Sequence, residues 1–376
     1  MDTDRSAYEY FTKSVEGRAK CLYYLGRSFS GKETIERIDA FAAYLRTLGV
    51  KKGEVVAINL PNTPECIFAI YAVNKLGAVA FVTHPLLPLE ALKKGIAETG
   101  AKLLVCRDSL GEEVGVPKVL CDGLGFLPFC KRAVAKLLHR SPDKRADRYP
   151  YKSLTPDPFP AQGKADDVAL YLPSGGTTGE PKTIRVTNRA FNENAEATLT
   201  LAKIPLEGHG VLLALPFFHG FGLSSSLHGA VSGGAEGIIL PFLDYPRAAK
   251  YVKRGKADII LAVPNMYKKL LAEPAFRRGI GRMTLAFSGG DTLPEKIKTE
   301  YDLLAEKAGG ESRLYQGYGL AETVSVCVAN CRGADKSGSI GRPVSAEVKI
   351  VDEAGKEVPL GQVGEIAVKT PCLMKG

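Results

Sequence analysis

The residues best suited to chemistry form a short loop, Ser174–Lys182, which follows the apolar run Val168–Leu172. Its sequence, SGGTTGEPK, combines three glycines, two threonines and one lysine. Glycine lets backbone N–H groups turn inward around an anion, threonine hydroxyls add donors, and lysine adds a positive charge. The loop therefore predicts a polyphosphate site. It is not a Walker loop, in which glycine directly precedes the lysine, because Pro181 holds that position.

Three further loops with unusual composition follow strand-like runs. Leu215–Leu223 places His219 among aromatic residues and glycines, so a pocket-lining role and a packing role are both open. Phe287–Leu293 offers glycine backbone against which a planar ligand could lie. Tyr315–Thr323 offers an aromatic face for a base and a carboxylate, Glu322, of the kind that binds phosphate-bound magnesium.

An alternating pattern predicts the elements that must position these loops. Between residues 55 and 106, and again between 168 and 287, short apolar runs alternate with amphipathic ones. This pattern is typical of strands and helices in turn, and thus of parallel sheets with helices on both faces. In such sheets, ligands bind beyond the carboxyl ends of the strands, where the four loops lie. The predicted strands are Val55–Leu60, Ala78–Val82, Lys102–Cys106, Val168–Leu172, Val211–Leu215, Gly237–Leu240, Asp258–Val263 and Met283–Phe287.

We therefore expect an α/β fold with two doubly wound, mostly parallel sheets and flanking helices. From Gly338 on, short alternating segments separated by glycine predict a small antiparallel β-region at the C-terminal end. The expected division is a first α/β subdomain at 1–165, a second one with the phosphate loop at 166–335, and a β-rich subdomain at 336–376.

The composition excludes several classes of protein. Of the 376 residues, 45% are hydrophobic and 24% are charged, as in ordinary globular proteins. No apolar run reaches the roughly 20 residues of a membrane-spanning helix, and the N-terminal MDTDRSAYEYF lacks the pattern of a secretory signal. The eight cysteines include no CxxC pair, and the histidines have no zinc-binding spacing. These features predict a cytoplasmic protein without a structural metal.

The positive charge is concentrated in residues 131–152, which hold eight Lys or Arg and two Asp. Apolar residues recur there at helical spacing, so the segment predicts a basic amphipathic helix. Such a helix could make peripheral contact with an anionic membrane or attract an acidic partner, or it could be a solvated surface helix. No nucleic-acid-binding motif accompanies it, so no nucleic-acid partner is expected.

Together, the four loops resemble those of the AMP-forming adenylate enzymes, which include acyl-CoA synthetases, firefly-type luciferases and the adenylation domains of peptide synthetases. The resemblance covers nearly the whole chain and is nearest to the fatty acyl-CoA synthetases. Outside the loops, the matching segments are Ile58–Asn62, Lys75–Val79, Gly338–Pro343 and Gly364–Ile366.

The resemblance implies roles for individual residues. Lys182, His219 and Glu322 would be the catalytic residues, and Glu322 would bind Mg²⁺. The ATP phosphates would lie against Ser174, Gly175, Gly176, Thr177, Thr178, Gly179 and Lys182. Adenine and the rest of the nucleotide would lie between Gly290, Asp291 and Thr292 on one side and Gln316, Gly317, Tyr318, Gly319, Ala321 and Glu322 on the other. The acyl pocket would include His219, Gly222, Ser224 and Gly317.

The resemblance also implies a reaction. A carboxylate would attack the α-phosphorus of ATP to give an acyl-adenylate and pyrophosphate, and coenzyme A would then accept the acyl group as a thioester. Amino-acid-activating relatives have an Asp at the position of His219, so an acid without an α-amino group is favoured, and a fatty acid over an aryl acid.

Four alternatives remain open from the sequence. Two are ligases of the same family: a fatty-acyl-AMP ligase that loads an acyl carrier protein, and an aryl-acid CoA ligase. A serine hydrolase is disfavoured because the chain has no GxSxG motif. A non-catalytic nucleotide or lipid sensor is the fourth.

The chain departs from the family pattern at three places. Ala321 stands where the family usually has a Thr or Ser that contacts the α-phosphate, and Thr323 or Ser325 could replace that donor. Thr183 replaces a common glycine. The chain also stops at Gly376, before the family's hinge and small C-terminal domain, so we expect this polypeptide to bind ATP or an acyl-adenylate and to turn over poorly.

Overall fold

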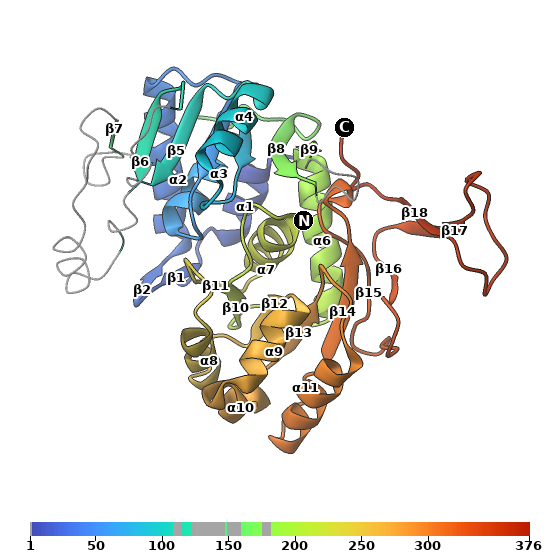
Figure 1. The fold of residues 1–376 in the computed structure, drawn as a ribbon. Helices are drawn as coiled ribbons and strands as arrows, with labels where there is room; N and C mark the ends of the chain where they lie inside the picture. The colour runs from blue at the N-terminus through green and yellow to red at the C-terminus, as the bar shows by residue number, and fades with distance from the viewer. Residues whose placement is uncertain (1, 108–113, 122–125, 127–146, 149–158, 175–181) are drawn as a thin grey trace.

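The computed structural model describes the chain except for residues 1, 108–113, 122–125, 127–146, 149–158 and 175–181. Two large sheets and one small sheet form its β-structure (Figure 1). The prediction of an α/β fold with two doubly wound, mostly parallel sheets and a small antiparallel region is confirmed. The basic segment 131–152 lies outside the described residues, apart from the backbone of one short strand.

The first sheet has the strand order β7-β6-β5-β3-β4-β8-β9, and all its neighbouring strands are parallel except β8 and β9. The strands are β3 (Val55–Asn59), β4 (Val79–Val82), β5 (Leu103–Arg107), β6 (Lys118–Cys121), β7 (Asp147–Arg148), β8 (Val168–Pro173) and β9 (Thr183–Thr187).

The second sheet has the order β16-β15-β14-β13-β12-β10-β11-β1-β2 and is parallel from β14 to β1. The strands are β1 (Leu22–Tyr24), β2 (Arg27–Phe29), β10 (Gly210–Leu213), β11 (Glu236–Ile239), β12 (Ile259–Ala262), β13 (Leu285–Ser288), β14 (Leu314–Gly319), β15 (Val326–Ala329) and β16 (Arg342–Pro343). A separate antiparallel pair, β17 (Glu347–Val351) and β18 (Glu365–Lys369), projects from the body of the molecule (Figure 1).

The two sheets do not divide the chain at residue 165. The N-terminal strand β1 pairs in parallel with β11 of the second sheet, whereas β8 pairs in parallel with β4 of the first. The hairpin β8–β9 thus completes the first sheet, although it follows the expected boundary.

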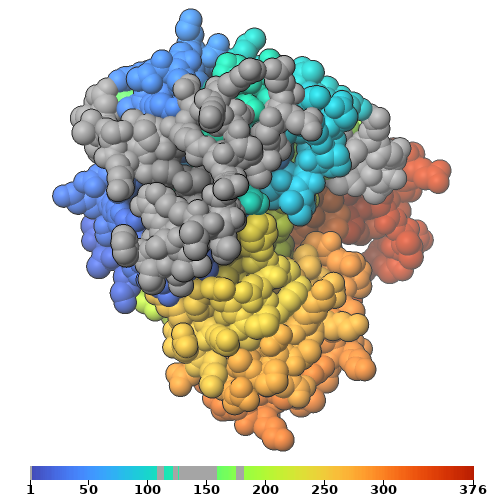
Figure 2. All heavy atoms as spheres, turned by 60° about the vertical axis from the view of Figure 1, so that its left-hand side comes forward, coloured from blue at the N-terminus to red at the C-terminus, as the bar shows by residue number. Residues whose placement is uncertain are grey.

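Helices fill the space between the sheets and cover their outer faces. Between the sheets, α3 contacts β3 and β4, while α6 contacts β8, β9 and β15. On the outer side of the second sheet, α8 to α11 pack on one another, and Figure 2 shows them in yellow to orange. The helices are α1 (Ala7–Val15), α2 (Gly31–Thr47), α3 (Pro64–Lys75), α4 (Leu89–Thr99), α6 (Asn188–Ala202), the π-helix η1 (Phe221–Gly229), α7 (Ala230–Ser232), α8 (Tyr245–Lys253), α9 (Pro264–Ala272), α10 (Pro274–Gly279), η2 (Ile280–Arg282), α11 (Glu295–Lys307) and η3 (Ala321–Thr323).

Both faces of the first sheet are buried, as is usual for parallel strands. Because successive side chains of a strand point to opposite faces, Val56 and Ile58 join the main core between the sheets, whereas Val55 and Ala57 pack with Leu92 of α4. Among the described residues, no helix is both long and apolar enough to cross a membrane.

Candidate functional site

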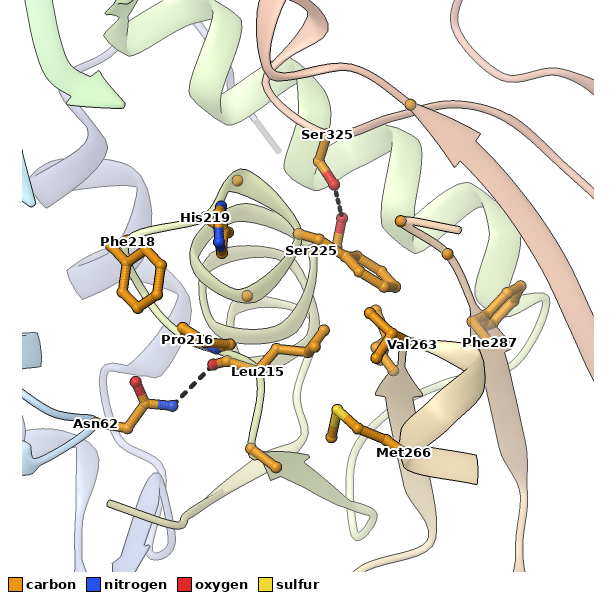
Figure 3. A pocket seen from close by; sticks show the side chains of 18 of the residues that line it. Asn62, Leu215, Pro216, Phe218, His219, Ser225, Val263, Met266, Phe287 and Ser325 are labelled. Carbon is orange, nitrogen blue, oxygen red and sulfur yellow. Dashed lines mark hydrogen bonds between the residues drawn. The ribbon is translucent and has the colours of Figure 1, made fainter. Parts of the chain in front are cut away.

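A cavity of about 710 Å³ opens beside the carboxyl ends of the second sheet's strands. Residues that follow β10, β12 and β13 line it, together with the end of β14 and one side of the π-helix η1 (Figure 3). This is the position at which open α/β sheets bind ligands, and the volume is typical of a small-molecule site.

One wall of the cavity is apolar. Leu215 follows β10, Val263 follows β12, and Phe287 lies within β13, so three neighbouring strands contribute to it. Met266, in the first turn of α9, extends the same wall (Figure 3). This surface suits a hydrocarbon or an aromatic ring.

Close backbone contacts hold η1 against the rest of the site. A Cβ atom on Gly220 would lie 1.6 Å from the carbonyl oxygen of Val324, and one on Gly222 would lie 2.2 Å from that of Pro216. Only glycine fits at such distances. Gly220, directly after His219, thus lets the start of the π-helix approach the turn after η3, and Gly222 lets it approach the loop after β10.

Asn62 joins the ends of the two sheets at the cavity. Its side-chain amide donates to the carbonyl oxygen of Leu215 at 2.8 Å (Figure 3) and to that of Leu213 at 3.3 Å. Its Oδ1 accepts from the backbone N–H of Phe217 at 3.2 Å. The side chain is buried. Asn62 therefore fixes the loop that carries His219.

Replacing Asn62 by alanine is expected to lower the free energy of unfolding by about 1–3 kcal/mol, because buried backbone groups of the loop lose their partner. Urea denaturation of Asn62→Ala against the wild type measures this loss. Lys51→Ala, at an exposed position before β3, is the control. Equal losses in the two variants would contradict the role assigned to Asn62.

His219 lies at the mouth of the cavity in an aromatic cluster. Phe218 separates it from His84, with ring centroids 4.4 Å from His219 and 4.6 Å from His84. Desolvation by the surrounding protein, followed by repulsion from the charge of His84, lowers the pKa of His219 below its ordinary value. Its imidazole is therefore neutral at pH 7, which suits contact with an acyl group better than pairing with an anion.

A strained turn follows the short helix η3. Val324 has φ of +64° and ψ of −52°, and the N–H of Ser325 donates to the carbonyl oxygen of Thr323 at 2.7 Å. This is a γ-turn with positive φ, which is rare and costs a β-branched residue about 1–3 kcal/mol. Val324 and Ser325 both line the cavity as a result.

The hydroxyls of Thr323 and Ser325 differ in how far hydrogen bonds within the protein already occupy them. Thr323 donates to the backbone carbonyl of Ser325, at 2.9 Å, and accepts from the backbone N–H of Leu320, at 3.1 Å. Ser325 instead shares a 2.9 Å hydrogen bond with Ser225 of the π-helix (Figure 3). Of the two residues considered as a replacement for the donor missing at Ala321, Ser325 is the one that faces the cavity.

Seven of the residues predicted for the site line this one cavity. They are His219, Gly222, Gly290, Gly317, Tyr318, Gly319 and Ala321. Ser224, predicted for the acyl pocket, is not part of the lining: its hydroxyl donates to Oδ1 of Asn194 at 2.9 Å, and Ser225 lines the cavity in its place. Gln316, Asp291 and Thr292 lie outside the lining, the last two exposed, with Asp291 accepting from the N–H of Thr292 at 2.7 Å.

Most of the predicted phosphate loop, Gly175 to Gly179 included, lies outside the described residues. Its two ends are described. The N–H of Ser174 donates to the carbonyl oxygen of Lys182 at 2.7 Å, directly after the paired residues Pro173 and Thr183 of β8 and β9. The loop is therefore the connection of a β-hairpin, with Ser174 buried and Lys182 exposed.

Several lining residues were not predicted from the sequence. Asn62 and His84 follow β3 and β4 of the first sheet, and the rule that ligands lie beyond strand ends could have identified both. Val263, Met266 and Phe287 are ordinary apolar residues. No local signal separates them from core residues, because only the packing of the second sheet exposes them to a cavity.

Comparisons with known proteins agree with this geometry. A family model described as AMP-binding enzyme matches residues 11–376. A long-chain-fatty-acid–CoA ligase of Bacillus subtilis is 28% identical over 379 residues, which cover 94% of this chain and 67% of that protein. The 4-coumarate–CoA ligase CCL1 of Humulus lupulus is also 28% identical, over 89% of this chain and 61% of its own length.

Solved structures share the fold. Apo MatB from Rhodopseudomonas palustris has a TM-score of 0.82 at 22% identity, over 100% of this chain and 72% of its own. A benzoate CoA ligase from Burkholderia xenovorans LB400 has a TM-score of 0.82 at 23% identity, over 98% of this chain and 72% of its own.

Proposed function

Because the chain belongs to the family of AMP-binding enzymes, we propose that it joins a carboxylic acid to AMP at the expense of ATP and transfers the acyl group to coenzyme A. We further propose a fatty acid as the substrate. The name of the Bacillus subtilis relative supports this choice, as does the apolar wall formed by Leu215, Val263 and Met266.

One observation carries the proposal: a single cavity is lined by five of the residues proposed for the nucleotide, Gly290, Gly317, Tyr318, Gly319 and Ala321, together with an apolar wall. Gly290, Gly317 and Tyr318 line one part of it, and Val263 and Met266 line another. An acyl-adenylate has a planar base at one end and an acyl group at the other, so one continuous site must accept both. The continuous lining of this cavity supports the proposal.

In the proposed reaction, the protein mainly has to position the substrates and stabilise charge. The substrate carboxylate is itself the nucleophile, so the site must hold it in line with the α-phosphorus and stabilise the negative charge that develops. We propose that Lys182 contributes positive charge to the phosphates. We propose that neutral His219 separates the acyl pocket from the path of the incoming thiol.

The chemistry of Glu322 supports the magnesium role proposed for it, although Glu322 is not one of the residues that line the cavity. Its side chain is half-buried, and within the described ranges its carboxylate has no hydrogen-bond or ion-pair partner, although its backbone carbonyl accepts from the N–H of Met374 at 2.7 Å. A single carboxylate is sufficient, because magnesium in nucleotide sites takes most of its ligands from phosphates and water. When bound, the ion would neutralise part of the phosphate charge.

Isothermal titration calorimetry with non-hydrolysable acyl-adenylate analogues of graded chain length, in the presence of Mg²⁺, tests the proposal. We expect micromolar binding that tightens as the alkyl chain lengthens and stops tightening once the apolar wall is covered. A benzoyl-adenylate analogue is the comparison for the aryl-acid alternative, which the 4-coumarate and benzoate ligases among the relatives favour. Absence of binding by every analogue would contradict the proposal.

Tyr318 provides a sharper test of the nucleotide end. Base stacking on an aromatic ring contributes about 1–3 kcal/mol, so Tyr318→Ala is expected to weaken binding of the acyl-adenylate analogue about 10- to 100-fold. Desolvation raises the pKa of the Tyr318 phenol, which stays neutral, so Tyr318→Phe should bind nearly as the wild type does. An alanine variant with unchanged affinity would remove Tyr318 from the nucleotide site.

A further inference from the structure

Two serines form a polar pair in the wall of the cavity. Ser225 comes from the π-helix η1 and Ser325 from the strained turn before β15, and their hydroxyl oxygens are 2.9 Å apart. Both side chains are almost completely buried, at 1% and 7% exposure, and both line the cavity. Figure 3 shows the bond between them on the side of the cavity that faces Val263 and Phe287.

The two hydroxyls can form more hydrogen bonds than the one between them. Two hydroxyls carry two protons, and their mutual bond uses one of them. The other proton and the remaining lone pairs have no partner among the described residues. A ligand hydroxyl can accept that proton and donate its own to the other serine, whereas a hydrocarbon can do neither.

A third hydroxyl strengthens the polar character of this lining. Ser288, at the end of β13, lines the cavity and is completely buried. Its Oγ has no hydrogen-bond partner within the part of the chain that the structure describes. Buried hydroxyls are normally paired, so this unpaired one adds a further polar group to the residues of the lining.

The backbone around Ser325 also indicates a role for its side chain. Val324 holds a conformation that a β-branched residue rarely adopts, and this conformation brings Ser325 to the cavity. Strain of this kind persists where the surrounding structure enforces it, and it concentrates at binding sites.

We propose that the substrate is a hydroxylated acid, whose hydroxyl group, set along the chain, bridges Ser225 and Ser325. This inference rests on the proposed function, since it refines the acid that the same cavity binds. An unsubstituted chain would cover the serine pair, exclude water and leave the spare proton unpaired. The site therefore discriminates against the plain hydrocarbon, as sites built to bond a hydroxyl do.

Calorimetry with three sets of acyl-adenylate analogues of equal length tests the inference. The sets are the unsubstituted chain, a positional series of hydroxylated chains, and the corresponding ketones. We expect the best hydroxylated analogue to bind at least about 10-fold more tightly than the unsubstituted one. It should also bind more tightly than its ketone, which can accept a hydrogen bond but cannot donate one. A ketone that binds better than every alcohol would overturn the assignment.

Variants locate the preference in the serine pair. In Ser225→Ala/Ser325→Ala the preference for the hydroxyl should disappear, with the unsubstituted analogue binding at least as tightly as before. Each single variant should reduce the preference for the hydroxylated analogue. The single variants therefore provide the test if the double variant does not fold. Ser226→Ala is the matched control, because Ser226 lies in the same helix outside the lining and donates to the carbonyl oxygen of Phe221 at 3.3 Å.

The outcomes separate this inference from the proposed function. Equal binding of hydroxylated and unsubstituted analogues by the wild type, or a preference that survives in the double variant, overturns the hydroxyl assignment and leaves the ligase proposal intact. Absence of binding by every analogue contradicts both.

Discussion

Replacing Gly220 by alanine is expected to lower the free energy of unfolding by about 3 kcal/mol or more. The new Cβ would lie 1.6 Å from the carbonyl oxygen of Val324, and neither backbone can yield easily. Gly220 is the N-cap residue directly before the π-helix, while Val324 lies in a turn that is already strained. The methyl group must therefore push apart the two segments that form the cavity wall.

Urea denaturation and titration of an acyl-adenylate analogue measure this effect on stability and on the site. For the denaturation alone, Gly317→Ala is the matched control, because its added Cβ would meet nothing closer than 3.6 Å. We expect it to cost less than about 1 kcal/mol. A Gly220 variant as stable as the Gly317 variant would show that the contact between helix and turn does not hold the site together.

His228 is expected to make the protein unstable in mild acid. It is completely buried in the π-helix, where Nε2 donates to Oδ1 of Asn192 and Nδ1 accepts from the hydroxyl of Tyr71, both at 2.9 Å. Its ring stacks on that of Phe191 with a centroid distance of 4.1 Å. The bond from Tyr71 requires the neutral imidazole, because only an unprotonated Nδ1 can accept, and burial lowers the pKa of His228 to about 3.

The sign of the pH dependence follows from this pKa. The folded state keeps His228 neutral, whereas the unfolded chain binds a proton below its ordinary pKa of about 6.5. Its stabilising contribution is complete above pH 6.5 and is lost as the pH falls toward 3. Within that interval, the unfolded state binds one proton that the folded state does not. The free energy of unfolding therefore falls by about 1.4 kcal/mol for each unit by which the pH falls.

His228→Phe isolates the effect, because it keeps the ring against Phe191 and has no proton to bind. Between pH 6.5 and 4.5, the free energy of unfolding of the wild type should fall more steeply than that of the variant, by about 1.4 kcal/mol per pH unit. Equal slopes would mean that His228 accepts a proton within the folded protein. The restricted pH range avoids the titration of most carboxylates.

The sequence predicts the fold well where local pattern decides it. The apolar runs that become β3, β4, β5 and β12 are recognisable because each is buried on both faces. Which sheet a strand joins is harder to predict from the sequence. Leu22 in β1 lies beside Gly237 in β11 only after more than two hundred intervening residues have folded, and no local pattern encodes that pairing.

In the site, too, some residues can be predicted from the local sequence, whereas others depend on the folded structure. His219 and Tyr318 lie in loops of unusual composition and are predicted directly. The choice between Ser224 and Ser225 depends on the geometry of the helix. In a π-helix the turn is wider than in an α-helix, so α-helical spacing does not identify the face that meets the cavity. The position of Asn62 after a strand can be read from the sequence, but its bonds to Leu213 and Leu215, about 150 positions away, cannot.

The exchange of strands between the two sheets has a consequence for folding. The first sheet is complete only when β8 has arrived from beyond residue 165, and one end of the second sheet is formed by the N-terminal strands β1 and β2. On a nascent chain, β1 and β2 therefore cannot join the second sheet until β11 (Glu236–Ile239) has been synthesised. Because such distant pairings must close large loops, refolding from denaturant should be slow, and both sheets should appear in one cooperative step.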